Sequence, residues 1–403
     1  MQITKSTFDG SGRIHLGSAY LNDKKDSDKK VYGRGQVVNV FFDGTGNNYF
    51  NANKRPGEES SYGNDKSNIA RMWESIDGDK GQSLSVYVEG IGTKRGQSDS
   101  GFMGGGFGLG EYGVEKRVYG AFDDIKKKIN ELGVKLPNVL TLNVFGFSRG
   151  AAAARYFVHL VNTEPQRFDS VGIPRSTTRV VVNFVGLFDC VTKIGVSVKN
   201  DVEKFGQKFY SGYASKVFHL RAGDEFRANF PVTDIQSAKG SCKGYELIIP
   251  GSHSDVGGGY AAGVASETKV LLRGDAFLGF MYEKGWYQPK HKLSDTAWRR
   301  NVIGSYQRVG LAIMTDKAEQ YSGIQYPAYL TNEPNGAHDE PVRVLMGILR
   351  PIAKNESKSE YKLEEWGGKQ RATWFREYYL HMSCDQGGIH GVTGDFKREP
   401  ISG

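Results

Sequence analysis

Cysteine is scarce in this sequence, and a long apolar run is missing altogether. Of the 403 residues only Cys190, Cys242 and Cys384 are cysteine, and no two of them are spaced as Cys-x-x-Cys. This spacing predicts neither a zinc site nor a disulfide framework, so we expect reduced and mostly buried thiols. No run of 18 apolar residues occurs, so we expect a chain that is soluble when it is made.

The N-terminus also lacks the basic and then apolar pattern of a cleaved signal peptide. Any export of the chain is therefore expected to proceed without such a signal. Residues 1–34 are polar and predict an extended N-terminal arm. The formal net charge is +8, with lysine and arginine scattered along the chain. This balance suits an acidic partner, such as an anionic lipid surface or a nucleic acid, and distinguishes neither.

Short apolar runs, each followed by a loop rich in glycine, aspartate or asparagine, are the main pattern that the sequence does contain. Near-continuous apolar runs of this kind are typical of strands that are buried on both faces. The runs are QVVNVFF, LSVYVEGI, VLTLNVFG, RVVVNFVGLF and GYELIIPG, at residues 36–42, 84–91, 139–146, 179–188 and 244–251.

A helical pattern lies between two of these runs. In residues 113–133 apolar side chains recur every three or four positions, with lysines opposite and Gly133 as a stop. The glycine-rich residues 100–110 before it predict a flexible loop over a site or a long connection. Strands that alternate with helices predict an α/β fold with a mostly parallel central sheet flanked by helices. In such sheets functional groups gather at the carboxyl ends of the strands.

The pattern is less regular after about residue 261. Residues 269–286 predict a helix, residues 318–341 a long loop region, and residues 371–384 an amphipathic or strand-like segment. We therefore divide the chain into the polar arm and one catalytic domain, residues 35–403. The part of this domain beyond residue 261 is expected to consist of irregular loop and helical additions.

Ser148 lies between two glycines in NVFGFSRGAAAARYF, residues 143–157, where an apolar run gives way to a helical pattern. A small residue two positions before and after a serine is what a strained strand-to-helix turn requires, because it avoids clashes with the neighbouring strand and helix. The hydroxyl then projects from the top of the sheet. The N–H of Arg149, at the positive end of the following helix, can face an oxyanion. We predict that Ser148 is a nucleophile.

A serine nucleophile needs a base, and the base needs a carboxylate that orients it. In α/β-hydrolases the order along the chain is Ser, then Asp or Glu, then His. Asp189 and His253 follow two of the predicted strands in this order. The sequence therefore predicts an α/β-hydrolase-like fold with Ser148, Asp189 and His253 as the triad.

Three other residues compete for these roles. Asp255 is the rival carboxylate and His381 the rival base, although this pairing takes the base from a region without a regular strand pattern. His219 falls inside a predicted strand, where a structural role is favoured over catalysis. The assignment of the base therefore stays between His253 and His381, with His253 preferred.

The segment FFDGTGNN, residues 41–48, has two interpretations. A phosphatase of the haloacid dehalogenase type needs an aspartate where Phe41 stands, so that interpretation fails. The glycine-rich turn instead suits a second oxyanion donor, from Gly44 or Thr45, with Asp43 bracing the turn by hydrogen bonds. A purely structural turn is an equally good interpretation of Asp43. Nothing here calls for a metal or a cofactor.

Six motifs occur together in register: FFDGTGNN, GFMGGGFGLG, GFSRGAAAAR, GLFDCV, VFHLRAGDEFRANF and PGSHSDVGGGY. In this order they resemble the α/β-hydrolase domain of type VI secretion phospholipase effectors over about residues 36–260, with a weaker match at YYLHMS. The resemblance implies an α/β-hydrolase core that acts on membrane phospholipids. It places the roles of nucleophile, acid and base on Ser148, Asp189 and His253.

The same resemblance implies how the protein is used. The implied reaction is cleavage of fatty-acyl esters, of the phospholipase A type, without a cofactor. The implied partners are a phospholipid membrane as substrate, a secretion spike component and a cognate immunity protein, with no nucleic acid. The protein would be made in a bacterial cytoplasm and act at the membrane or periplasm of a target cell. A carboxylesterase or peptidase with a soluble substrate, and an inactive binding module, are the alternatives.

Overall fold

The fold is given by a computed structural model of the chain. It describes residues 8–9, 13–14, 35–56, 58, 60–77, 84–99, 112–131, 133, 136, 138–193, 202–261, 263–270, 275–287, 292–293, 296–332, 340–383, 398 and 400–403. Most of the predicted N-terminal arm and the whole of the predicted glycine-rich loop at 100–110 lie outside these residues.

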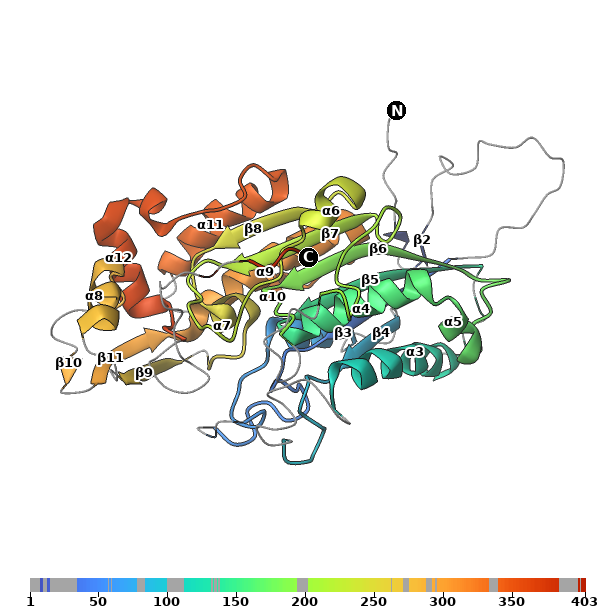
Figure 1. Cartoon of the computed structure of the whole chain (residues 1–403), viewed down its shortest axis with the longest axis horizontal. Coiled ribbons are helices and arrows are strands. Elements are labelled where there is room, and N and C mark those ends of the chain that lie inside the picture. Colours follow the sequence, from blue (N-terminus) through green and yellow to red (C-terminus); the bar gives the residue numbers. More distant parts are fainter. Residues whose placement is uncertain are drawn as a thin grey trace.

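A six-stranded parallel sheet lies at the centre of the molecule (Figure 1). Its strands in spatial order are β4 (Leu84–Val88), β3 (Gln36–Phe42), β5 (Val139–Phe147), β6 (Arg179–Phe188), β7 (Lys216–Ala222) and β8 (Tyr245–Ile249). Every neighbouring pair in this sheet runs parallel. The five apolar runs all become strands of it, so the predicted mostly parallel sheet is confirmed.

Helices cover both faces of the sheet because the strands are apolar on both faces. On one face Val40 and Phe42 of β3 pack in a cluster with α3 (Val114–Glu131) and α4 (Arg149–Thr163). On the other face Phe41 packs with α1 (Asn68–Asp77) and α9 (Gln307–Ser322). This alternation follows from the period of two along a strand. The predicted helix at 113–133 is confirmed, and Gly133 has a positive φ of 60° just beyond its end.

The part of the chain after residue 261 is more regular than the sequence predicts. Residues 318–322 complete α9 and residue 340 begins α11, so the predicted long loop is wrong at both of its ends. Residues 371–379 of the segment predicted to be amphipathic or strand-like belong to a helix, α12. The predicted helix at 269–286 begins as a strand. The helices here are α8 (Asp275–Lys284), α10 (Ala328–Asn332), α11 (Glu340–Asn355) and α12 (Gly368–Tyr379), with 3-10 turns at Gly304–Tyr306 and Leu363–Trp366.

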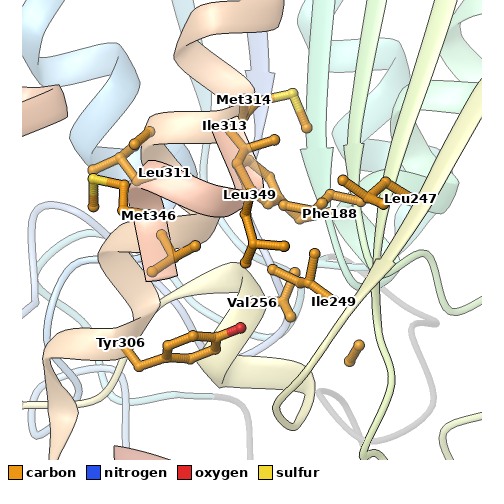
Figure 2. Close-up of a cluster of buried hydrophobic side chains, with 14 of the residues drawn as sticks. Phe188, Leu247, Ile249, Val256, Tyr306, Leu311, Ile313, Met314, Met346 and Leu349 are labelled. Atoms are coloured by element: carbon orange, nitrogen blue, oxygen red, sulfur yellow. The ribbon is translucent and has the colours of Figure 1, made fainter. Parts of the chain in front are cut away.

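Helix α9 explains why this region is ordered. Its side chains Leu311, Ile313 and Met314 are fully buried between the sheet and α11 (Figure 2). Burying one large apolar side chain stabilises a fold by about 1.5–3 kcal/mol. Most residues of α9 up to Ala318 are buried, so its sequence shows little of the polar stripe that marks an amphipathic helix.

The remaining elements are short. Two small antiparallel sheets pair β1 with β2, and β9 and β10 with β11. Figure 1 shows β9–β11 near α8 and α12, at the end of the molecule opposite α3 and α5. These elements are β1 (Phe8–Asp9), β2 (Arg13–Ile14), β9 (Val264–Val270), β10 (Lys292–Leu293), β11 (Thr296–Ile303), α5 (Gln166–Ser170), α6 (Gln236–Ser241) and α7 (His253–Gly257).

The strand order places a crevice at the carboxyl ends of β3 and β5. The chain leaves β3 through α1 on one face of the sheet and leaves β5 through α4 on the other face. Divergent connections of this kind open a crevice at the ends of the two strands, where ligands bind in α/β sheets. Among the described residues no helix is long and apolar enough to cross a membrane.

Candidate active site

Ser148 lies on the strained turn that the sequence predicts. It falls between the end of β5 at Phe147 and the start of α4 at Arg149, with φ 58° and ψ −128°. A positive φ is uncommon outside glycine and persists where the surroundings enforce it, as at functional sites. The residue is 4% exposed. Its backbone is fixed from both sides, because its N–H donates to the carbonyl of Phe188 and its own carbonyl accepts from Val191.

The two glycines beside the serine are required by close backbone approach. A β-carbon on Gly146 would lie 2.5 Å from the carbonyl oxygen of Gly150. A β-carbon on Gly150 would lie 2.2 Å from the carbonyl oxygen of Asp43. Real β-carbons do not approach backbone so closely, so any side chain at either position would push α4 away from β3 and β5. The Gly-x-Ser-x-Gly pattern is therefore a packing requirement of this turn.

Asp189 and His253 form a buried pair. Asp189 directly follows β6 with φ 38°, and His253 is the first residue of α7. The His253 Nδ1 atom lies 2.5 Å from Asp189 Oδ2, and the N–H of Ala222 donates to Asp189 Oδ1 at 3.0 Å. Because the ionised carboxylate can only accept, Nδ1 carries the proton and Nε2 is the free acceptor of the ring.

Burial and charge set the protonation of this pair. Burial lowers the pKa of the His253 imidazole, against the raising effect of Asp189, so its neutral form is favoured near neutral pH. The ring packs between Phe147 and Phe230, at centroid distances of 4.6 and 5.1 Å. Burial alone would raise the pKa of Asp189, but Arg398 and His253 outweigh it and hold that pKa far below its usual range. Asp189 is therefore a carboxylate and His253 a neutral base.

Ser148 and His253 line one cavity of about 190 Å³ at the carboxyl end of the sheet. Other residues of its wall are Thr45, Phe147, Arg149 and Tyr260. The hydrogen bonds found among the described residues do not include one from Ser148 Oγ to His253. Such contacts often tighten only when substrate is bound. The cavity thus brings the predicted nucleophile and the preferred base to the same space.

Asp255 and His381 form a second pair. His381 Nδ1 lies 2.8 Å from Asp255 Oδ1, and the His381 N–H donates to Asp255 Oδ2 at 2.9 Å. Asp255 also accepts from the N–H and hydroxyl of Ser252, which caps the N-terminus of α7. The His381 ring stacks on Tyr260 with centroids 3.7 Å apart, and His381 is not among the residues lining the cavity. This pair therefore supports the helix that begins at His253.

His219 is a fully buried residue of β7 that holds two neighbouring elements together. Its Nδ1 atom lies 2.9 Å from Glu246 Oε2, and its Nε2 accepts the N–H of Cys190 at 3.0 Å. Arg221 donates to the same glutamate. Both ring nitrogens are thus occupied, and the second bond fixes the backbone next to Asp189. The geometry matches the structural role that the sequence favours for this histidine.

The two predicted oxyanion donors of the turn after β3 have different surroundings. The N–H of Gly44 donates to Asp43 Oδ1 at 2.7 Å and is therefore engaged within the turn. Asp43 also accepts from Ser67 and Tyr87, each at 2.6 Å, and burial raises its pKa to about 6. Asp43 therefore braces the turn. Thr45 lines the cavity, and its buried Oγ1 has no hydrogen-bond partner among the described residues.

Three charged residues near the pair were not predicted from the sequence. Glu225 accepts the backbone N–H of His253 at 3.2 Å, and Arg227 forms a two-point ion pair with Glu225. Arg398 donates to both oxygens of Asp189. Glu225 and Arg227 lie in the motif VFHLRAGDEFRANF, which could have marked them. No local signal marks Arg398, because its partner is 209 positions away.

Comparison with known proteins identifies the family. The family model described as the catalytic domain of Tle1-like type VI secretion (T6SS) phospholipase effectors matches residues 36–164 and 169–284. The chain is similar to the solved Tle1 effector bound to the VgrG spike of the type VI secretion system, with a TM-score of 0.60 and 22% identity over 92% of this chain and 89% of that one. At this identity the likeness shows the fold.

A second solved structure is described as an uncharacterized protein from Pseudomonas aeruginosa. Its TM-score is 0.40, with 18% identity over 86% of this chain and 64% of that one, which is too low to support an argument. No curated protein sequence matches the chain. The family model covers more than half of the 403 residues. The chain therefore belongs to the Tle1-like family of type VI secretion phospholipase effectors.

Proposed function

We propose that this effector cleaves fatty-acyl esters of membrane phospholipids with Ser148 as nucleophile, His253 as base and Asp189 as the acid that orients the base. The observation that supports this most strongly is the cavity that Ser148, on its strained turn, shares with the buried His253–Asp189 pair. Membership of a phospholipase effector family supplies the substrate class.

The reaction is an acyl transfer in two steps. Ser148 Oγ attacks the ester carbonyl carbon while His253 Nε2 takes the hydroxyl proton, and Asp189 stabilises the imidazolium that forms. The tetrahedral intermediate expels the glycerol oxygen, which receives the proton from His253, and leaves an acyl ester on Ser148. A water molecule then attacks this ester while His253 takes its proton, and His253 returns that proton to Ser148 Oγ as the fatty acid is released.

The oxyanion of each intermediate needs donors on the side of the cavity that faces β3 and α4. Arg149 is the first residue of α4, and the N–H groups of a first helical turn point out of the helix at its positive end. Thr45 offers its backbone N–H and its hydroxyl from the turn after β3. Donors aimed at developing charge are usually the largest single contribution to such a reaction.

The size of the cavity fits the reacting ester. Pockets that enclose a whole drug-sized ligand are about 300–1,000 Å³, and this cavity is about 190 Å³. It can hold the ester group and the atoms next to it, with the rest of the lipid extending out of the crevice. This arrangement suits an enzyme that takes its substrate from a membrane surface.

Proposals for delivery and inhibition rest on the family membership. The solved Tle1 effector is bound to the VgrG spike, and we propose that this chain is carried by a spike component of the same kind. It would then act at the membrane of a target cell, and the cell that makes it would need an immunity protein that blocks the crevice. A pull-down would test the first of these partners. The spike protein should be recovered with this chain as bait and not with an unrelated protein as bait.

The test of the reaction is release of fatty acid from phospholipid vesicles. Replacing Ser148 with alanine should reduce turnover on the order of 10⁶-fold, because the nucleophile of a triad is lost. Released fatty acid and released phosphate should be measured together, since only an acyl esterase produces the first without the second. A thermal melt like that of the wild type shows that the variant is folded, and near-normal turnover by such a variant excludes the proposed nucleophile.

The same assay separates the alternatives. A soluble-substrate esterase would cleave short dispersed esters and spare vesicles, whereas a binding module would retain vesicle binding without release of fatty acid.

The chain has a formal net charge of +8, so its binding to vesicles should be stronger when the lipid is anionic. This binding should weaken with added salt, because charges are screened within about 8 Å at physiological ionic strength.

A further inference from the structure

Arg398 forms a two-point ion pair with the proposed triad acid. Its Nη1 donates to Asp189 Oδ1 at 2.7 Å, and its Nη2 donates to Asp189 Oδ2 at 2.9 Å. The arginine side chain is 7% exposed and the aspartate side chain is fully buried. Arg398 lies outside the residues matched by the family model, which end at 284. The mechanism proposed above makes no use of this residue.

We propose that Arg398 is a positioning residue of the active site, which holds Asp189 in the orientation and charge state that His253 needs. This inference rests on the proposed triad and adds a fourth member to it. Arg398 does not touch substrate or the reacting atoms. It acts on the reaction through the carboxylate alone.

The arginine is itself fixed by its neighbours. Its Nε donates to the carbonyl of Phe230 at 2.7 Å, so three of its five N–H groups have defined partners. Residues 400–403 bind along the segment 232–237. The Ile401 N–H donates to the carbonyl of Val232, and the Ile401 carbonyl accepts from the N–H of Asp234. The N–H of residue 403 donates to Asp234 Oδ1, and its carbonyl accepts from the N–H of Ser237. The pairing of residues 400–403 with 232–237 therefore helps to fix the Arg398 guanidinium in one position beside the Asp189–His253 pair.

The carboxylate needs such a partner because it is buried and strained. An ionised carboxylate in a dry interior is destabilised unless it is paired and hydrogen-bonded. Asp189 also has a positive φ of 38°, which a non-glycine residue keeps only when its surroundings enforce it. Arg398 pairs the charge of Asp189 and restrains its side chain, because the planar guanidinium binds both carboxylate oxygens and fixes the plane of the carboxylate.

The positive charge also acts on the base. The charged groups facing His253 are Asp189, Arg227 and Glu225. Arg227 and Arg398 also face Glu225, and despite its burial they hold its pKa at about 2. Because Arg398 balances the charge of Asp189, the imidazole binds its extra proton less tightly than it would beside a lone carboxylate. The base is therefore neutral, and active, down to a lower pH.

Two variants of Arg398 test this role. Arg398→Gln should lower kcat on the order of 10²-fold, because a small displacement of a catalytic group has that effect. It should also move the acid limb of the kcat/KM profile to higher pH, because His253 gains proton affinity when the opposing charge is lost. Arg398→Lys keeps the charge and loses the fork, so kcat should fall while the acid limb stays near its wild-type position.

Arg350→Gln is the matched control. Arg350 forms the same two-point pair with Asp316, from Nε at 2.6 Å and Nη2 at 2.7 Å, and this pair lies between α11 and α9 away from the cavity. Its loss should lower the melting temperature without changing kcat or the pH profile. If Arg398→Gln does the same as the control, and no more, Arg398 is only structural and the inference is overturned.

A double-variant cycle separates this inference from the proposed function. In an Asp189→Asn background, Arg398→Gln should have almost no further effect on kcat, because the carboxylate through which Arg398 acts is gone. Full additivity would overturn the positioning role. If Ser148→Ala abolishes turnover while Arg398→Gln leaves kcat and the pH limb unchanged, the triad stands and only Arg398 is excluded. If Ser148→Ala is active, both fail. Should Arg398→Gln not fold, Arg398→Lys tests the orienting role alone: its kcat should fall with the acid limb in place, and a wild-type kcat would overturn the inference.

Discussion

Two aspartate–histidine pairs lie at the carboxyl end of the same sheet, and they differ in what surrounds them. In both, a histidine Nδ1 lies against a buried carboxylate, at 2.5 Å for Asp189–His253 and 2.8 Å for Asp255–His381. The first pair faces a cavity that contains Ser148. The second has its imidazole stacked on Tyr260 and its carboxylate in the cap of α7.

A paired histidine is therefore not by itself a catalytic base. His253 differs from His381 because it lines a cavity. Ser148, which lies on a strained turn, lines the same cavity. The second pair supports the first, because Asp255 caps the helix whose first residue is His253. One pair is therefore proposed to do chemistry, and the other to hold it in place.

The largest difference between the pairs should appear on removing the imidazoles. His253→Ala should lower fatty-acid release from vesicles on the order of 10⁶-fold, because the base acts as one unit with the nucleophile. His381→Ala should leave turnover within about tenfold of the wild type, since it changes only the support of α7. Equal losses in both variants, or a larger loss for His381→Ala, would reverse the roles assigned to the two pairs.

Replacing the two carboxylates should have effects that differ in kind as well as in size. Asp189→Asn should lower kcat on the order of 10⁴-fold, because the amide cannot orient and stabilise the imidazolium in the same way. Asp255→Asn should instead lower the free energy of unfolding by about 1–2 kcal/mol, through the loss of a helix cap and its hydrogen bonds. Urea unfolding and vesicle assays on the same two proteins provide the check. A large loss of turnover without a loss of stability in Asp255→Asn would contradict this division.

A change at the proposed oxyanion donor Thr45 should have an intermediate effect on turnover. Thr45 lines the cavity of the first pair, so the second pair should not be affected. Thr45→Val removes the buried hydroxyl, keeps the shape of the side chain, and should lower kcat about 10²-fold if that hydroxyl holds the oxyanion. Its stability should be unchanged or slightly higher, because a buried hydroxyl without a partner destabilises a fold. Thr45→Ser is the control that keeps the donor. Unchanged kcat in Thr45→Val would leave the oxyanion to backbone N–H groups alone.

The sequence predicts the sheet well because five of its six strands are apolar runs. The proposed triad residues also have local signals: Ser148 and Asp189 directly follow β5 and β6, and His253 comes four positions after β8. Local pattern cannot choose between the two pairs, because Asp255 and His253 are two positions apart and both come to the site. The choice depends on side-chain direction, which the structure supplies.

Three other features could not be predicted from the local sequence pattern. Arg398 meets Asp189 across 209 positions, through pairing of residues 400–403 with 232–237, and no spacing rule reaches that far. The N–H of Gly44 donates to the side chain of its neighbour Asp43, and composition does not reveal that this donor is already engaged. Helix α9 is missed because burial of most of its residues weakens the periodic pattern of apolar and polar positions.

The smallest effect concerns the pH dependence of the first pair. Burial lowers the pKa of His253 from its ordinary value of 6.5, more than Asp189 raises it. A base must be neutral to accept the proton of Ser148, and a lowered pKa keeps it neutral to lower pH, so activity is lost only as the pH falls through the lowered value. The acid limb of kcat/KM should therefore have its midpoint below 6.5. His381→Ala should leave that midpoint unchanged, and a midpoint that moves with His381 but not with changes beside His253 would assign the titrating base to the second pair.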